Sequence, residues 1–133
     1  MRAEFHRAVL SFGSNDFFKG RNNIDQAIEY LNGGYGEFTA RSEIYTSKPC
    51  GLNSGDKDYY NCVGFFKTHL SINELEKELK NFEVLMGRQK DDINHEVPVD
   101  IDIVMWEGVI VRPLDYEREY FKKGYDSLID RYV

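Results

Sequence analysis

Two aspartates stand two residues apart at the start of a hydrophobic run, in Asp100-Ile101-Asp102-Ile103. Strand side chains alternate between faces, so the aspartate pair (Asp100 and Asp102) shares one face and the isoleucines share the other. Two residues at ~3.3 Å each place the carboxylates about 7 Å apart along the strand. Such neighbouring charges repel unless a cation or a proton compensates them. Hard oxygen ligands suit Mg²⁺, above all Mg²⁺ that carries phosphates. Taken alone, however, the pattern favours two solvated acids on a half-exposed edge strand.

Alternating and helical patterns indicate the elements that must position this pair. Strands are expected over residues 7–12, 37–45, 58–70, 100–106 and 109–111, and helices over 22–32 and 71–87. Asn22 is the expected N-cap of the first helix. Ser71 and Glu74 form a capping box at the start of the second helix. Residues 112–133 are expected to be a partly helical tail.

The order of the longer elements is β-α-β-β-α-β, followed by the short strand over 109–111 and the tail. This order predicts an α+β, ferredoxin-like fold in which an antiparallel sheet carries two helices on one face. The other face is then left for a site or a partner. A chain of 133 residues is expected to form a single domain over 1–133.

The composition limits the classes of function. Lys and Arg number 17 against 23 Asp and Glu, a net charge of −6, which argues against general nucleic-acid binding. No apolar run is long enough to span a bilayer and no secretory leader is recognisable, so a cytoplasmic location without membrane association is expected. Cys50 and Cys62 lack zinc-type spacing and are expected to be free thiols. We expect a monomer or weak dimer.

Four groups of residues, taken in order, resemble the 6-hydroxymethyl-7,8-dihydropterin pyrophosphokinase family. These groups are Gly13-Ser14-Asn15, the loop before Tyr59-Tyr60-Asn61, Glu83 with Gly87-Arg88, and the aspartate pair. The resemblance runs from about Val9 to Val111. It implies a ferredoxin-like enzyme of folate biosynthesis that moves pyrophosphate from ATP to a pterin hydroxymethyl group. Two Mg²⁺ ions and ATP as co-substrate are implied with it.

The resemblance also implies roles for particular residues. It assigns Mg²⁺ binding to Asp100 and Asp102 and a catalytic role to them and to Arg88. It assigns the pterin pocket to Tyr59 and Asn61, with Ser47 and Cys50 from the preceding loop. It assigns the nucleotide to Glu83, Arg88 and Lys90. A lysine at position 90, where the family usually has arginine, keeps the charge but loses the bidentate fork.

The departures from the family lie on the nucleotide side. Val97 occupies the position of a family arginine, and the tail is short, with Arg112, Arg118, Lys122 and Lys123 as its available cations. Each lost charge-assisted phosphate contact would cost ~1.5–3 kcal/mol. Two alternatives therefore stay open beside the enzyme. One is a non-catalytic family member that binds a pterin, a nucleotide or a protein. The other is an unrelated ferredoxin-like interaction domain.

Overall fold

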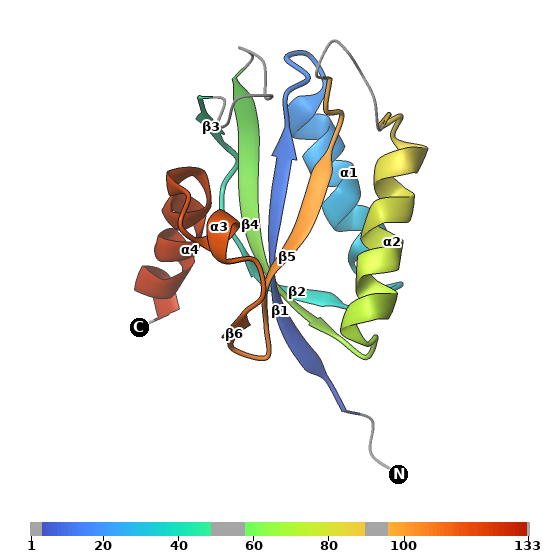
Figure 1. The fold of residues 1–133 in the computed structure, drawn as a ribbon, viewed down its shortest axis with the longest axis vertical. Helices are drawn as coiled ribbons and strands as arrows, with labels where there is room; N and C mark the ends of the chain where they lie inside the picture. Colours follow the sequence, from blue (N-terminus) through green and yellow to red (C-terminus); the bar gives the residue numbers. More distant parts are fainter. Residues whose placement is uncertain (1–3, 49–57, 90–95, 133) are drawn as a thin grey trace.

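The chain folds into a β-sheet with helices on both faces in the computed structural model, which describes residues 4–48, 58–89 and 96–132 (Figure 1). The strands are β1 (His6–Ser14), β2 (Glu37–Arg41), β3 (Tyr45–Ser47), β4 (Tyr59–Thr68), β5 (Asp100–Trp106) and β6 (Val109–Ile110). The helices are α1 (Gly20–Leu31), α2 (Ile72–Leu85), α3 (Pro113–Tyr116) and α4 (Glu119–Tyr132). The strand order is β2-β4-β1-β5-β6, with β3 paired to β4 and every named pair antiparallel. The predicted ferredoxin-like arrangement is confirmed.

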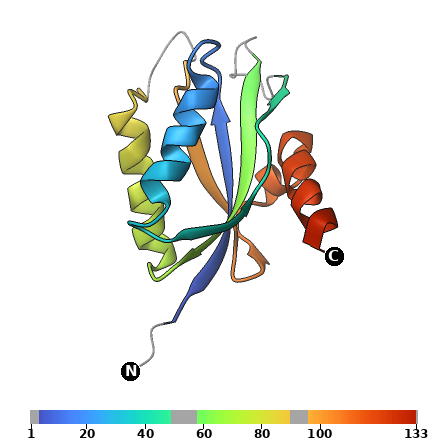
Figure 2. The same ribbon diagram turned by 180° about the vertical axis from the view of Figure 1, so that it is seen from behind.

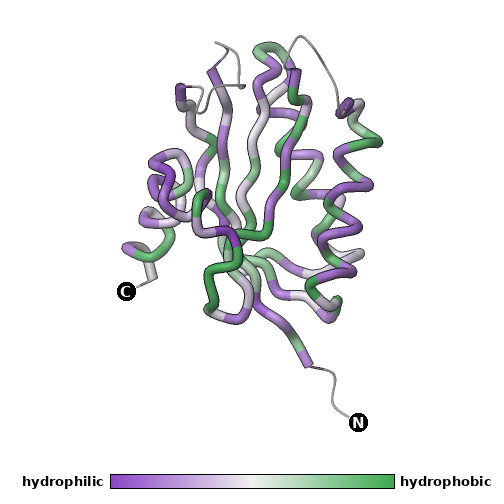
Figure 3. The backbone as a smooth tube through the Cα atoms, viewed as in Figure 1, coloured by the Kyte–Doolittle hydropathy of each residue, from purple (hydrophilic) through white to green (hydrophobic). Residues whose placement is uncertain are grey.

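Helices α1 and α2 lie side by side on one face of the sheet (Figures 1 and 2). Hydrophobic and hydrophilic residues alternate along both helices, as amphipathic packing requires (Figure 3). Their buried side chains meet the inward residues of β1, β4 and β5, which include Leu10, Phe12, Cys62, Phe66, Ile101 and Ile103. The capping box of Ser71 and Glu74 is present at the start of α2, as predicted. Within the described part of the chain, no helix combines the length and apolarity needed to cross a membrane.

The second face of the sheet is covered in part by the tail. Phe121 and Leu128 of α4 are 0% and 1% exposed and pack against Val63 of β4 and Val104 of β5. Gly124 lets α4 approach closely, because a Cβ built there would lie 2.7 Å from Val63 Cγ2. The prediction of a partly helical tail is confirmed, and the structure places its helix α4 on the sheet face that was expected to stay open. The part of this face that lies beyond α4 remains uncovered.

The predicted start of α1 is wrong. The helix begins at Gly20, after Lys19, and Asn22 lies inside it rather than at its N-cap. The carboxylate of Asp16 accepts hydrogen bonds from the backbone N–H groups of Phe18 and Lys19, and Gly20 N–H donates to the Asp16 carbonyl. These bonds satisfy backbone N–H groups just before the first turn of the helix. The helix α1 therefore begins at Gly20, before the predicted N-cap at Asn22.

The predicted strand over 37–45 is in fact two strands, β2 and β3. Between them Ser42, which is 4% exposed, uses its side chain within the ladder. The Val63 N–H donates to Ser42 Oγ at 2.9 Å, and that hydroxyl donates to the Glu43 carbonyl at 2.9 Å. A hydroxyl that replaces the backbone as a partner interrupts the strand.

Candidate active site

The sheet face that α4 covers is apolar beside the helix and polar beyond it. On β4, Val63 packs against α4, and Asn61 and Tyr59 follow on the same face toward the strand's start. On β5, Val104 packs against α4, and the aspartate pair follows on the same face. Strand alternation thus brings two groups that are distant in the sequence to the uncovered end of one face.

A cavity of about 140 Å³ opens at this uncovered end, and we call it the sheet-face cavity. Its lining residues are Ser11, Phe12, Gly13, Ser47, Lys48, Tyr59, Asn61, Asp100, Asp102 and Tyr120. The structure therefore brings together Ser47, Tyr59 and Asn61, which the resemblance assigns to the pterin, with the aspartate pair, which it assigns to Mg²⁺. Asn61 is 4% exposed, and its amide donates to Ser47 Oγ at 2.7 Å. Burial, followed by the charge of Asp100, raises the pKa of Tyr59.

The two aspartates differ in environment although they share a face. The Asp100 side chain is 37% exposed and that of Asp102 is 15% exposed. Burial and then the charge of Asp100 raise the pKa of Asp102 to about 6, although the charge of Lys80 acts in the opposite direction. Since Ile101 and Ile103 are 0% and 3% exposed, the predicted division between an acidic face and a core face is present.

Three cations, from α2, from the segment after it and from the segment before α3, surround the aspartate pair. Arg88 Nη1 lies 3.1 Å from Asp100 Oδ1 and 3.6 Å from Glu83 Oε1. Lys80 Nζ lies 3.3 Å from Asp102 Oδ1 and 2.9 Å from Glu83 Oε2. Arg112 Nη1, from the segment before α3, lies 3.9 Å from Asp102 Oδ1. The three acidic and three basic side chains therefore form one group in which opposite charges lie next to each other.

Glu83 is not on a solvated helix face. Its side chain is 6% exposed, and Oε2 accepts a hydrogen bond from the Ile101 N–H at 2.8 Å. The Ile101 carbonyl accepts from Lys80 Nζ at 3.1 Å. Ile101 lies opposite Phe12 of β1, and both of its backbone groups bind side chains of α2. Two side chains of α2 therefore occupy the place of a neighbouring strand.

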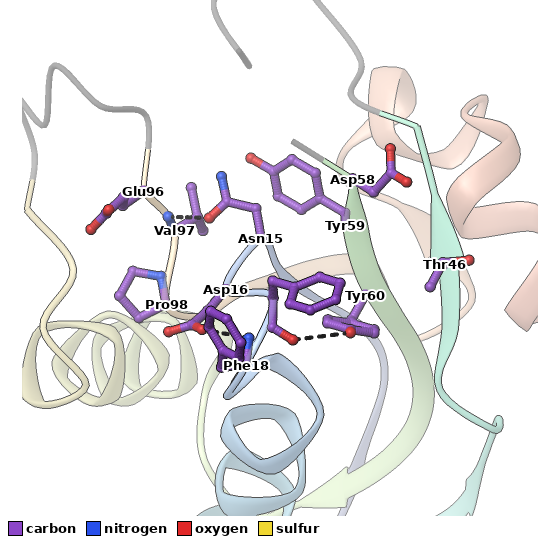
Figure 4. A pocket seen from close by; sticks show the side chains of 11 residues that line it. Asn15, Asp16, Phe18, Thr46, Asp58, Tyr59, Tyr60, Glu96, Val97 and Pro98 are labelled. Carbon is purple, nitrogen blue, oxygen red and sulfur yellow. Dashed lines mark hydrogen bonds between the residues drawn. The ribbon is translucent and has the colours of Figure 1, made fainter. Parts of the chain in front are cut away.

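The Gly13-Ser14-Asn15 turn holds the segment that precedes β5. Asn15 Oδ1 accepts from the Val97 N–H at 2.7 Å, and Asn15 N–H donates to the Val97 carbonyl at 3.0 Å (Figure 4). A larger pocket of about 640 Å³ lies here and shares Tyr59 with the sheet-face cavity. Its described lining includes Asp16, Asp58 and Glu96 but neither lysine nor arginine. This charge balance suits a neutral group better than a phosphate chain.

The donors present fit Mg²⁺ that arrives with phosphates. Mg²⁺ keeps several waters and is usually bound through one or two carboxylates plus substrate phosphates. The aspartate pair offers two such groups on the wall of the sheet-face cavity. Among the described residues, no cluster of three or more His, Cys, Asp or Glu side chains is placed to hold a metal ion. A site completed by the nucleotide agrees with both observations.

Two assigned residues, Cys50 and Lys90, lie outside the described part of the chain. Other residues around the aspartate pair were not assigned from the sequence. Lys80 lies three residues before Glu83 on α2, and this spacing indicated a shared helix face. Tyr120 of α4 lines the sheet-face cavity, and only the packing of the tail reveals this.

The fold and the site together define a ferredoxin-like α+β protein with paired carboxylates and a polar pocket on one sheet face. The family model of 7,8-dihydro-6-hydroxymethylpterin-pyrophosphokinase matches residues 9–127, and the chain belongs to this family of folate-synthesis enzymes. It is also 30% identical over 119 residues to folic acid synthesis protein FOL1 of Dictyostelium discoideum. That match covers 84% of this chain and 18% of the relative, so the chain spans less than a fifth of that protein's length.

Proposed function

We propose that the protein transfers pyrophosphate from ATP to 6-hydroxymethyl-7,8-dihydropterin in a reaction that depends on Mg²⁺. The main observation in support of this proposal is that the aspartate pair, Tyr59 and Asn61 line the same sheet-face cavity. The pterin hydroxyl oxygen forms a bond to the β-phosphorus of ATP. The bond from that phosphorus to the bridging oxygen of AMP breaks, and the hydroxyl proton leaves. AMP and the pterin pyrophosphate are the products.

Charged side chains support the proposed binding of the nucleotide. The aspartate pair would hold Mg²⁺, which supplies electrostatic stabilisation of the phosphate oxygens when bound. Arg88 is placed beside Asp100 and carries a planar fork that matches phosphate geometry. Arg112 approaches from the other side of the pair. Transfer of this kind depends on positioning and electrostatics, and these side chains supply both without a protein nucleophile.

The pterin half rests on polar and aromatic groups. The Asn61 side chain carries a donor and an acceptor that can pair with the edge of a pterin, and its bond to Ser47 fixes its orientation. The Tyr59 ring can pack against the flat face of the ligand. Tyr59 lines both pockets, so a ligand held there lies within reach of the aspartate pair.

The test is direct. The purified protein is incubated with Mg²⁺, ATP and 6-hydroxymethyl-7,8-dihydropterin, and AMP and the pterin pyrophosphate are quantified together. We expect equal amounts of both products, and their loss in Asp100→Ala and Asp102→Ala variants that keep the fold by circular dichroism. Product formation that persists in both variants would contradict the metal assignment.

A second candidate function is pterin binding without catalysis. It is favoured by Val97, which stands where the family has an arginine and whose backbone bonds Asn15. Absence of AMP above background, with saturable pterin binding by calorimetry, would select this candidate. Absence of both AMP formation and pterin binding would contradict both candidate functions, and the family match already contradicts the third alternative, an unrelated interaction domain.

A further inference from the structure

Lys80 already occupies the position of a counter-cation at the aspartate pair. Its ammonium group lies 3.3 Å from Asp102 Oδ1, 4.0 Å from Asp100 Oδ1 and 2.9 Å from Glu83 Oε2. It also donates to the Ile101 carbonyl at 3.1 Å. One cation thus binds Asp102 and the backbone carbonyl between the two aspartates, and lies 4.0 Å from Asp100 Oδ1.

The surroundings hold this ammonium group in place. Lys80 lies on α2, whose Leu75, Leu79 and Phe82 are buried in the core and fix the helix against β5. Glu83, on the same face of α2, binds Lys80 and the Ile101 N–H with one oxygen. The long stem of Lys80 nevertheless leaves its side chain 43% exposed, so the ammonium group has room to turn toward solvent.

We infer that Lys80 is a positioning residue that compensates the aspartate pair in the free protein and must release Asp102 before a divalent cation binds there. The inference rests on the proposed function, because it takes the pair as the metal site. A cation on one oxygen of Asp102 opposes a second cation at the same carboxylate by direct repulsion. Lys80 therefore sets the metal affinity and keeps it low until phosphates arrive with the ion.

The experiment measures Mn²⁺ binding by the loss of the free-ion electron paramagnetic resonance signal, with no nucleotide present. We expect Lys80→Gln to bind Mn²⁺ at least about tenfold more tightly than the wild type. Thermal unfolding gives a second readout. Without metal, Lys80→Gln should unfold at a lower temperature, because three carboxylates lose their shared cation. Saturating Mn²⁺ should then stabilise this variant more than the wild type.

Three variants make the result specific. Lys77→Gln removes the same charge from an exposed position on α2 and should leave Mn²⁺ affinity unchanged. Lys80→Arg keeps the charge and should stay close to the wild type. In an Asp102→Asn background the effect of Lys80→Gln should shrink. If Lys80→Gln fails to fold, Glu83→Gln and the double variant with Lys80→Gln provide the same comparison.

The measurements distinguish a failure of the role inferred for Lys80 from a failure of the proposed metal site. Equal Mn²⁺ affinity in the wild type and Lys80→Gln, or equal destabilisation with and without metal, overturns the inference and leaves the proposed function standing. No saturable Mn²⁺ binding in either protein, with ATP or without it, overturns the metal site and the inference together. Tighter binding in Lys80→Gln alone supports the assigned role.

Discussion

At the scale of single residues, the environment of Asp102 changes its acid–base chemistry. Its pKa is raised from 3.8 to about 6 by burial and by Asp100, so the folded state binds a proton that the unfolded state has lost. Between these two pKa values, stability falls as pH rises, because the unfolded state then binds fewer protons. The contribution is fully present below about pH 4 and is lost as pH rises through about 6.

We therefore predict a pH-dependent difference between the metal-free wild type and Asp102→Asn. From pH 4 to pH 7 the free energy of unfolding of the wild type, relative to the variant, should fall by at most about 3 kcal/mol. Urea unfolding at several pH values in EDTA measures this difference. If the free energy of unfolding of the wild type relative to the variant stays constant or rises with pH, the pKa of Asp102 is not raised in the folded state.

Residue-level reasoning from the sequence succeeded where strand alternation decides direction. The faces of Asp100, Asp102, Tyr59 and Asn61 follow from a period of two, and the structure brings all four to one cavity. The same reasoning could not find the buried contact of Glu83 with the Ile101 N–H, because it joins a helix to the edge of a strand across 18 residues.

At the scale of elements, α2 acts as the missing neighbour of β5. We predict that Glu83→Ala exposes the Ile101 amide, because the carboxylate that accepts its N–H is gone. The loss should be about 1–3 kcal/mol of stability, together with faster exchange of that amide by nuclear magnetic resonance. Glu83→Gln keeps an acceptor oxygen and should retain most of the protection.

Asn81→Ala, at an exposed position of α2, is the matched control and should leave Ile101 exchange unchanged. Equal loss of protection in Glu83→Gln and Glu83→Ala would indicate that the charge of Glu83, rather than its hydrogen bond, protects the edge.

The contact of α4 with the sheet depends on Gly124. A helical alanine is ordinarily about 1 kcal/mol more favourable than glycine. Here a Cβ would lie 2.6 Å from Tyr45 Oη and 2.7 Å from Val63 Cγ2. We predict that Gly124→Ala lowers stability by about 1–3 kcal/mol in spite of the helical preference.

Urea unfolding measures the Gly124→Ala change, and Asp130→Ala, on an exposed position of the same helix, serves as the control. A net gain of stability in Gly124→Ala would mean that α4 shifts away from the sheet without cost. The sequence could not foresee this contact, since it depends on how closely the tail packs. The division of residues 37–45 at Ser42 was missed for a similar reason, because one hydroxyl replaced a backbone partner.

At the scale of the whole molecule, the order of elements was enough to predict an antiparallel sheet with α1 and α2 on one face. The second face was predicted to be left open, and in part it is. The tail covers its apolar end with Phe121 and Leu128, and the polar end remains uncovered. Helical spacing predicted a helix in the tail, but its place on the sheet depends on distant partners in β4 and β5.

The two halves of the sheet-face cavity should respond differently to metal removal. The chain has a net charge of −6, and the aspartate pair adds local repulsion for a polyphosphate. The part of the cavity proposed to bind the pterin, with Asn61, Ser47 and Tyr59, carries no carboxylate and is expected to need no metal. We predict that EDTA weakens binding of a non-hydrolysable ATP analogue by about a hundredfold or more relative to millimolar Mg²⁺.

Pterin binding to the same sample should change by less than about tenfold, because its partners are hydrogen bonds and ring contacts that salt and metal screen little. Isothermal calorimetry with each ligand, with and without EDTA, makes the comparison. Equal weakening of both ligands would mean that the metal orders the whole cavity rather than the phosphate end. Unchanged nucleotide binding would mean that Arg88, Arg112 and Lys80 hold the phosphates without the aspartate pair. The difference between the two ligands therefore measures how far the charged and neutral ends of one sheet face act independently.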